Sequence, residues 1–411
     1  MRQPSHLLAG AQRVARGLRA QLTRSARGRP RPLPGLRRVL RILGPGLVTG
    51  AADDDPSGIG TYSQAGAAFG VGQLWLALYM LPMLIAVQEM CARIGLVTGR
   101  GIAANLRAHY SRPILYFTVA LVFAANTLNI GADLGAMTAT IQLFAPDAPF
   151  LPLLVALALA ILALEIFVPY HRYAIVLKVL ALSLLAYVAT GLIVGTKGAL
   201  PLRATLIPSI QLTPEFLALV VGILGTTISP YLFFWQASEE VEEVEAHHRK
   251  PRGIDPARER SSLLKQLRAL RVDTVFGLTA AATTFWFIVM TSGNTLHTHG
   301  ITNIQSADQA ALALRPLAGP FAQQLFALGI VGTGLLAVPV LAGSAAYGIA
   351  EAVGWHEGLA KTLNHARGFY GVIALATLVG LALNLLGVNP IAALVDTAII
   401  NGVVAVPLLV L

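Results

Sequence analysis

The sequence predicts an all-α membrane protein with about ten transmembrane helices. Of its 411 residues, 55% are hydrophobic and only 12% are charged, with a mean hydropathy of +0.67. This composition is far more apolar than that of an ordinary soluble domain. Because lipid offers no hydrogen-bond partners, spanning segments must be helices or closed β-barrels. Continuous apolar runs without the alternation of barrel strands favour helices.

Stretches of about 20 apolar residues, the length that crosses a bilayer as a helix, recur from Val39 to Leu411. Together with the loop signals between them, they define ten expected spans. Their approximate limits are 39–67, 73–97, 113–143, 149–168, 171–196, 214–245, 270–292, 319–350, 367–387 and 389–411.

The loops between these spans alternate in charge. By the positive-inside rule, the basic loops lie in the cytoplasm together with both termini, in agreement with an even number of spans. We therefore expect an integral, multi-pass protein of the bacterial inner (plasma) membrane. The basic positions that decide this are Arg93, Arg100, Arg107, Arg112, Arg172, Lys178, the stretch 249–271, Lys361 and Arg367.

Residues 1–38 contain ten arginines and no acid. This composition predicts a disordered cytoplasmic tail near anionic lipid, and an organelle transit peptide is the alternative. Residues 39–411 form the expected membrane domain, in two repeats at about 39–196 and 214–411. Because the formal charge of +10 lies in this tail and in loops, it indicates topology, and no nucleic-acid partner is expected. The single cysteine, Cys91, excludes an internal disulfide.

Two spans are interrupted at matching places. The first contains three carboxylates, Asp53, Asp54 and Asp55, followed by Pro56 in an otherwise apolar helix, and the sixth contains Pro230. Proline breaks a helix, and intramembrane carboxylates face a cavity or the bundle interior. Five plus five spans with a discontinuous first helix in each half indicate an inverted-repeat transporter. The acids favour a cationic substrate.

The segment Gly44-Pro45-Gly46, then Asp55-Pro56-Ser57-Gly58, Gln64-Ala65-Gly66-Ala67 and Phe69-Gly70, resembles the Nramp family of proton-coupled divalent metal transporters. The likeness covers nearly all of residues 38–411 and implies a LeuT-like 5+5 inverted repeat with discontinuous helices one and six. In that family, Asp-Pro-Gly-Asn in the first span and Ala-Thr-Val-Met-Pro-His in the sixth supply the metal ligands. The resemblance implies these substrate-binding positions here: Asp55, Asp54, Asp53, Gly58, Ser229 and the carbonyls of Ala52 and Thr226.

Three departures from the family motifs replace polar or sulfur side chains. Gly58 stands at the asparagine position, Ser229 at the methionine position and Tyr231 at the histidine position. Loss of the soft thioether shifts the expected preference toward harder ions. Mg²⁺ and Mn²⁺ are therefore expected ahead of Fe²⁺, with Mg²⁺ partly hydrated.

Two alternatives stand for the energy source of transport, proton coupling and the membrane voltage. Asp133 matches the aspartate of the family's Thr-Asp-Leu-Ala-Glu segment, which implies a proton route through Asp133 and Tyr231. The glutamate of that segment is Ala136 here, so proton-driven symport and voltage-driven uptake stand as equal alternatives. Asp396 and Asn401 in the tenth span are further candidates to line the same cavity, although helix packing explains Asn401 equally well.

The expected function is secondary transport of a divalent cation by alternating access, with no enzymatic activity and no cofactor beyond the transported ion. A transporter of the same architecture for an organic cation or amino acid is the alternative, and a non-transporting receptor is a third class. Oligomeric state is not predicted. The acidic run 239–245 beyond the sixth span is expected to be a solvated helix extension. Glu89 and Arg93, four residues apart, are expected to pair.

Overall fold

The computed structural model describes residues 50, 52–168, 185–195, 201–247 and 256–411. The basic tail 1–38, the first half of the first expected span, most of the fifth span with Arg172 and Lys178, and Arg249 lie outside the described residues.

Where it is described, the chain is helical and contains no strand. Eight stretches are long and apolar enough to cross a membrane, and they match expected spans two, three, four and six to ten. The described ends of the first and fifth spans are also helical. The principal helices are α4 (Pro56–Phe69), α5 (Trp75–Thr98), α6 (Ile102–His109), α7 (Arg112–Ile141), α8 (Phe150–Phe167), α10 (Leu185–Gly195), α11 (Leu202–Leu206), α12 (Pro214–Thr227), α13 (Pro230–His247), α14 (Pro256–Thr295), α15 (Ala307–Ala311), α16 (Arg315–Ala318), α17 (Ala322–Val353), α18 (Arg367–Leu383) and α19 (Pro390–Val410).

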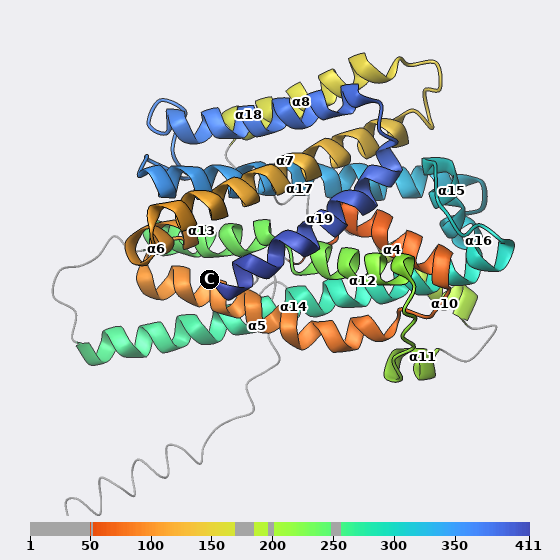
Figure 1. Cartoon of the computed structure of the whole chain (residues 1–411), viewed down its shortest axis with the longest axis horizontal. Helices are drawn as coiled ribbons and strands as arrows, with labels where there is room; N and C mark the ends of the chain where they lie inside the picture. Colours follow the sequence, from red (N-terminus) through yellow and green to blue (C-terminus); the bar gives the residue numbers. More distant parts are fainter. Residues whose placement is uncertain (1–49, 51, 169–184, 196–200, 248–255) are drawn as a thin grey trace, which may run out of the picture. The chain divides into compact units, whose positions relative to one another are not determined.

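The helices pack in two groups (Figure 1). In one group α7 packs against α17 and α18, and α8 lies against α7 and α18. In the other, α14 packs against α4, α5 and α10, and α5 packs against α13. α19 contacts α7, α4 and α12, so it lies between the groups. The elements of both broken spans therefore face the same interior.

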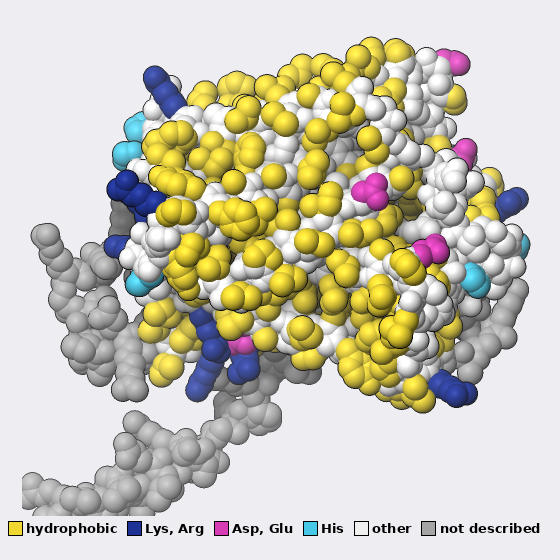
Figure 2. All heavy atoms as spheres, viewed as in Figure 1, with side chains coloured by type: hydrophobic (Ala, Val, Ile, Leu, Met, Phe, Trp, Pro, Cys, Tyr) yellow, Lys and Arg dark blue, Asp and Glu magenta, His cyan; other side chains and the backbone are white. Residues whose placement is uncertain are grey.

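The outer helix faces are apolar, as an integral membrane protein requires. Phe117 of α7 and Val403 of α19 are 61% and 62% exposed. Figure 2 shows hydrophobic side chains across most of the visible face, with Lys and Arg gathered mainly at the end where α6 lies. At that end α14 begins at Pro256, so part of the basic stretch expected as a loop is helix.

One buried carboxylate ties α6, α13 and α17 together near α6. Glu351 of α17 is 4% exposed, and it accepts hydrogen bonds from the Ala104 amide at 2.9 Å and the Ser238 hydroxyl at 2.8 Å. The Ala104 amide is one of the open donors in the first turn of α6. Glu351 therefore caps α6 from a distant part of the sequence.

The acidic run after the sixth span is not a solvated extension throughout, so that expectation was wrong in part. Glu240 is only 7% exposed and accepts a hydrogen bond from Gln236 at 3.0 Å. Glu242 accepts from the Tyr347 hydroxyl and from the Leu359 amide, the latter at 2.8 Å. Glu242 meets Tyr347 because α13 packs against α17 there, whereas the partner of Glu240 lies on α13 itself. The expected Glu89–Arg93 ion pair is confirmed.

Backbone contact at glycine brings α12 and α19 together beside the second break. A Cβ at Gly225 would clash with the Ala398 carbonyl oxygen and the Gly402 amide. A Cβ at Gly402 would meet the Val221 carbonyl oxygen. Small residues allow this close approach between membrane helices, where packing rather than the hydrophobic effect drives association.

We predict that Gly225→Ala lowers the melting temperature of the purified protein, because the added methyl forces α12 and α19 apart at a cost of about 1–3 kcal/mol. Gly371→Ala in α18 is the matched control, since a Cβ there meets nothing within 4 Å. Thermal unfolding in detergent measures both variants. Equal melting temperatures would show that the α12–α19 contact is not as tight as described.

Candidate functional site

The first break lies at Asp55, which is the N-cap of α4. Its Oδ1 accepts hydrogen bonds from the Gly58 amide at 2.7 Å and the Ser57 hydroxyl at 2.6 Å. Aspartate is a preferred N-cap because its side chain satisfies the open amides of the first turn. Pro56 at the first helical position costs no hydrogen bond there. The sequence Asp-Pro-Ser-Gly thus starts a helix in the middle of the expected span.

The second break lies at Ile228 and Ser229, between the end of α12 at Thr227 and the start of α13 at Pro230. Pro230 lacks the amide that would continue the helix. The Ser229 hydroxyl points back to the carbonyl oxygens of Gly225 and Thr226, the latter at 2.8 Å. One hydroxyl proton serves only one of them at a time. The last turn of α12 therefore retains carbonyl oxygens without a helical partner.

Asp55 connects the two breaks to α7. Its Oδ2 accepts a hydrogen bond from the Asn129 side-chain amide at 3.0 Å and a longer one from the Tyr231 hydroxyl at 3.4 Å. The single Tyr231 hydroxyl proton can instead go to the Ala52 carbonyl oxygen, which is nearer, at 2.8 Å. The hydroxyls of Ser57 and Thr226 lie 3.4 Å apart across the breaks. Residues of both breaks thus form one connected polar cluster around Asp55.

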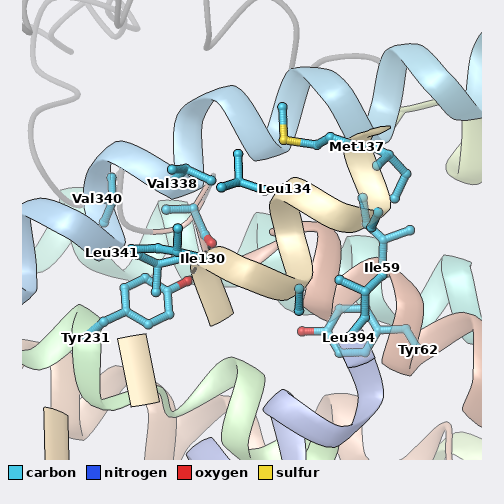
Figure 3. Packing of buried hydrophobic residues seen from close by; sticks show 14 of the residues in the cluster. Ile59, Tyr62, Ile130, Leu134, Met137, Tyr231, Val338, Val340, Leu341 and Leu394 are labelled. Carbon is cyan, nitrogen blue, oxygen red and sulfur yellow. Dashed lines mark hydrogen bonds between the residues drawn. The ribbon is translucent and has the colours of Figure 1, made fainter. Parts of the chain in front are cut away.

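This cluster is closed off from solvent. Asp53, Asp54, Asp55 and Asp133 are all at most 3% exposed. Figure 3 shows apolar side chains from α4, α7, α13, α17 and α19 in this region of the core. Carboxylates in such surroundings are costly unless they are partnered by donors, protons or cations.

Asp133 of α7 lies within electrostatic range of Asp55 and faces the Ser57 backbone. Neither of its carboxylate oxygens has a hydrogen-bond partner by standard geometry among the described residues. Asp133 is four residues after Asn129, so both are on one face of α7. The helical spacing therefore places Asp133 on the side of α7 that faces the Asp55 cluster.

Gly58 has no side chain because the position is crowded. A Cβ there would lie 3.1 Å from the Asp53 carbonyl oxygen, 3.2 Å from the Thr226 hydroxyl and 3.3 Å from the Tyr62 ring. The structure therefore leaves little room for a side chain at position 58, where α4 comes close to Thr226. Gly58 offers backbone atoms alone, and its amide already serves Asp55.

Asp396 is not part of this cluster, so its expected place in the same cavity was wrong. It is exposed and lines a separate hollow of about 160 Å³ with Gly131, Asn384 and Thr397. Asn401 is 1% exposed, and its amide lies 3.4 Å from the Asn129 side-chain oxygen. Five residues on a helix turn the direction by about 140°, so Asp396 and Asn401 face different ways.

Asn129 and Tyr62 are cluster residues that sequence reasoning did not assign. Asn129 is fully buried and bonds both Asp55 and Asn401. The sequence could have identified Asn129, because a polar residue one turn before Asp133 in an apolar span faces the bundle interior. Tyr62 is fully buried in electrostatic range of the three consecutive acids.

Among the described residues, no three His, Cys, Asp or Glu side chains converge as a ready metal-ligand set. The cluster instead offers mixed oxygen donors: carboxylates, hydroxyls, a side-chain amide and backbone carbonyls. Such donors suit hard cations rather than soft ones.

The sequence pattern of the family described as natural resistance-associated macrophage protein-like, or Nramp, matches residues 46–411. The chain belongs to the Nramp family. This match covers both breaks, α7 and α19, so it includes every described element of the Asp55 cluster. The resemblance seen in the sequence is confirmed.

Solved structures confirm the expected fold class. An Eremococcus coleocola manganese transporter in complex with an aromatic bis-isothiourea substituted compound matches with a TM-score of 0.68 at 17% identity, over 92% of this chain and 78% of that one. Mhp1, a nucleobase-cation-symport-1 family transporter in a closed conformation, matches with a TM-score of 0.57 at 12% identity, over 84% and 71%. At these identities the likeness shows the fold.

We predict that Asn129→Ala destabilises the protein by about 1–3 kcal/mol, because it removes a buried donor to the Asp55 carboxylate. The expected result is a lower melting temperature in detergent than that of wild type. Asn303→Ala, at an exposed loop position, is the control and should have the same melting temperature as wild type. A melting temperature unchanged by Asn129→Ala would contradict the described contact.

Proposed function

We propose that the protein moves a divalent metal cation across the membrane by alternating access, with the substrate bound where the two helix breaks meet. The observation that carries this proposal is the position of Asp55. It caps one broken helix and contacts Tyr231 of the other, inside a bundle that closes it from solvent. A carboxylate at paired helix ends is suited to a cation.

Family membership and a structural neighbour support a metal substrate. The chain is an Nramp protein, and the Eremococcus coleocola protein of the same fold is named a manganese transporter. The proposed ligands are Asp55, with Asp54, the Ser229 and Thr226 hydroxyls, and the carbonyl oxygens of Ala52, Thr226 and Gly58.

The donors favour a hard ion. All are oxygen atoms, and the residue at the thioether position, Ser229, is a hydroxyl. Oxygen donors suit Mg²⁺ and Mn²⁺, and Mg²⁺ keeps several waters in its sites. We therefore rank these two ions ahead of Fe²⁺. In the closed state Asp55 is occupied by protein donors, so cation binding requires Asn129 and Tyr231 to withdraw their hydrogen bonds.

Proton coupling is proposed through Asp133. It lies near Asp55 without a hydrogen-bond partner among the described residues, so a proton is one way to offset its buried charge. Tyr231 connects Asp55 to the Ala52 carbonyl and completes this polar route. Voltage-driven uptake without protons is the competing mechanism, and internal pH distinguishes the two.

The distribution of basic residues supports an inner-membrane protein with a cytoplasmic N-terminus. Arg93, Arg100 and Arg107 lie around α6, at the end where the Glu351 and Glu242 contacts close the bundle. By the positive-inside rule this end faces the cytoplasm. The structure would then be closed on the cytoplasmic side by α13 and α17.

Ion uptake into proteoliposomes tests the proposal. Vesicles that contain the purified protein and an internal pH dye are given Mg²⁺, Mn²⁺, Fe²⁺ or Ca²⁺ outside, and the uptake of the four ions is compared. Asp55→Ala and the exposed loop variant Asp147→Ala are measured as a matched pair. We expect saturable Mg²⁺ or Mn²⁺ uptake that Asp55→Ala abolishes and Asp147→Ala preserves. Acidification of the lumen that requires Asp133 would establish coupling.

Two outcomes would contradict the proposal. If no divalent ion enters, the organic-substrate alternative takes its place, with flux of a radiolabelled organic cation or amino acid as its test. If Asp55→Ala transports as well as wild type, the substrate does not pass the breaks as proposed.

We further predict that Ser229→Cys makes uptake more sensitive to Cd²⁺. A thiolate is a soft ligand, so Cd²⁺ should inhibit Mn²⁺ uptake at about tenfold lower concentration than in wild type. Ser292→Cys, at a buried position of α14 whose hydroxyl has no hydrogen-bond partner among the described residues, is the control, and both variants retain the native Cys91. Equal Cd²⁺ sensitivity in the two variants would remove Ser229 from the ligand set.

A further inference from the structure

The three consecutive acids of the first break are not equivalent. Asp55 receives hydrogen bonds from four donors on α4, α7 and α13. Asp53 is equally buried, at 1% exposed, yet neither of its carboxylate oxygens has a hydrogen-bond partner among the described residues. One oxygen of Asp54 is likewise without one. Donors from the protein therefore occupy the Asp55 carboxylate, while Asp53 and Asp54 retain acceptor oxygens without a hydrogen bond among the described residues.

Tyr62 faces the same two acids. It lies in the second turn of α4, is fully buried, and is in electrostatic range of Asp53 and Asp54. Its hydroxyl has no hydrogen-bond partner by standard geometry in the described part of the chain. The ring packs edge-to-face on Phe285 of α14, with centroids 4.8 Å apart. The buried phenol thus adds a third unused oxygen beside the two carboxylates.

Part of this group faces α14. Asp54 faces Thr284 and Tyr62 packs on Phe285, both on α14. Asp55 is instead bonded to Asn129 on α7 and lies within reach of Tyr231 on α13. The Tyr62 ring also lies beside Gly58, whose amide bonds Asp55, so the oxygens toward α14 adjoin the Asp55 contacts.

Buried carboxylates without donors are unfavourable, and two neighbouring ones repel each other. A divalent cation between them would offset both charges at once. The nearby groups are a pair of carboxylates and a phenol, and such oxygen donors suit a hard ion that keeps some of its waters. No soft or nitrogen donor belongs to this described set.

We propose that Asp53, Asp54 and Tyr62 form a second divalent-cation position on the α14 side of the first break, next to the Asp55 site. The proposal rests on the transport function proposed above, because the second ion would be the same kind of substrate. It gives Asp53 and Tyr62 a binding position of their own, which shares the Asp54 carboxylate with the ligand shell of Asp55.

Equilibrium Mn²⁺ binding to the purified full chain in lipid nanodiscs tests this position. Free Mn²⁺ is measured by its electron paramagnetic resonance signal. We expect two ions per chain in wild type, one in Asp53→Asn, one in Asp54→Asn and one in Asp55→Asn. The exposed loop variant Asp147→Asn should bind two. Tyr62→Phe keeps the packing on Phe285 and should weaken one of the two positions about tenfold.

The outcomes separate the two proposals. One ion per chain in wild type, lost in Asp55→Asn and retained in Asp53→Asn, would overturn the second position and leave the transport site intact. No Mn²⁺ bound by wild type would contradict both. If Asp53→Asn melts well below wild type, its lost binding could reflect unfolding, and the Mn²⁺ affinity of Tyr62→Phe then becomes the test. Unchanged affinity at both positions in Tyr62→Phe would overturn the proposal.

Discussion

The organisation of the core depends on one buried carboxylate at a helix end. Asp55 cannot be solvated, so donors must come from the protein, and they come from three helices: Ser57 and Gly58 on α4, Asn129 on α7 and Tyr231 on α13. Each donor is placed by its own helix, so the carboxylate fixes their mutual positions. The first break is thus both the start of α4 and the point where the two helix groups meet.

The same constraint gives the site its capacity to change. Hydrogen bonds to a charged group are strong individually, but here they are distributed over helices of both groups. A cation that takes over the Asp55 oxygens would release Asn129 and Tyr231 together and so loosen α7 and α13 from α4. At the α6 end, Glu351 and Glu242 join α13 to α17 in a comparable manner. In the proposed mechanism, binding at the centre and closure at that end would therefore act on one helix, α13.

Local sequence signals predicted the helices and both breaks, because proline, glycine and buried acids act on the backbone where they stand. Pro56 and Pro230 start helices as expected. The sequence did not reveal the partners of these groups. The bond from Asn129 to Asp55 and the capping of α6 by Glu351 join residues 74 and 247 positions apart. Such contacts depend on tertiary packing, which periodicity does not contain.

The errors have the same origin. Asp396 is an acid in an apolar span, and its sequence context does not separate it from Asn401, yet their helix directions place them in different surroundings. The acidic run was expected in solvent because charge runs on helix ends usually are, whereas α17 supplies Tyr347 to Glu242. The glycine at position 58 is explained by tertiary contacts, because a Cβ there would crowd the nearby Thr226 and Asp53 atoms.

The most direct test of the central claim is a structure of the protein with Mn²⁺, with anomalous scattering measured at the manganese edge. The account predicts an anomalous peak beside Asp55, between the start of α4 and the end of α12. Peaks confined to other places, such as the Glu242 and Glu351 contacts or the hollow at Asp396, with none at the breaks, would contradict it.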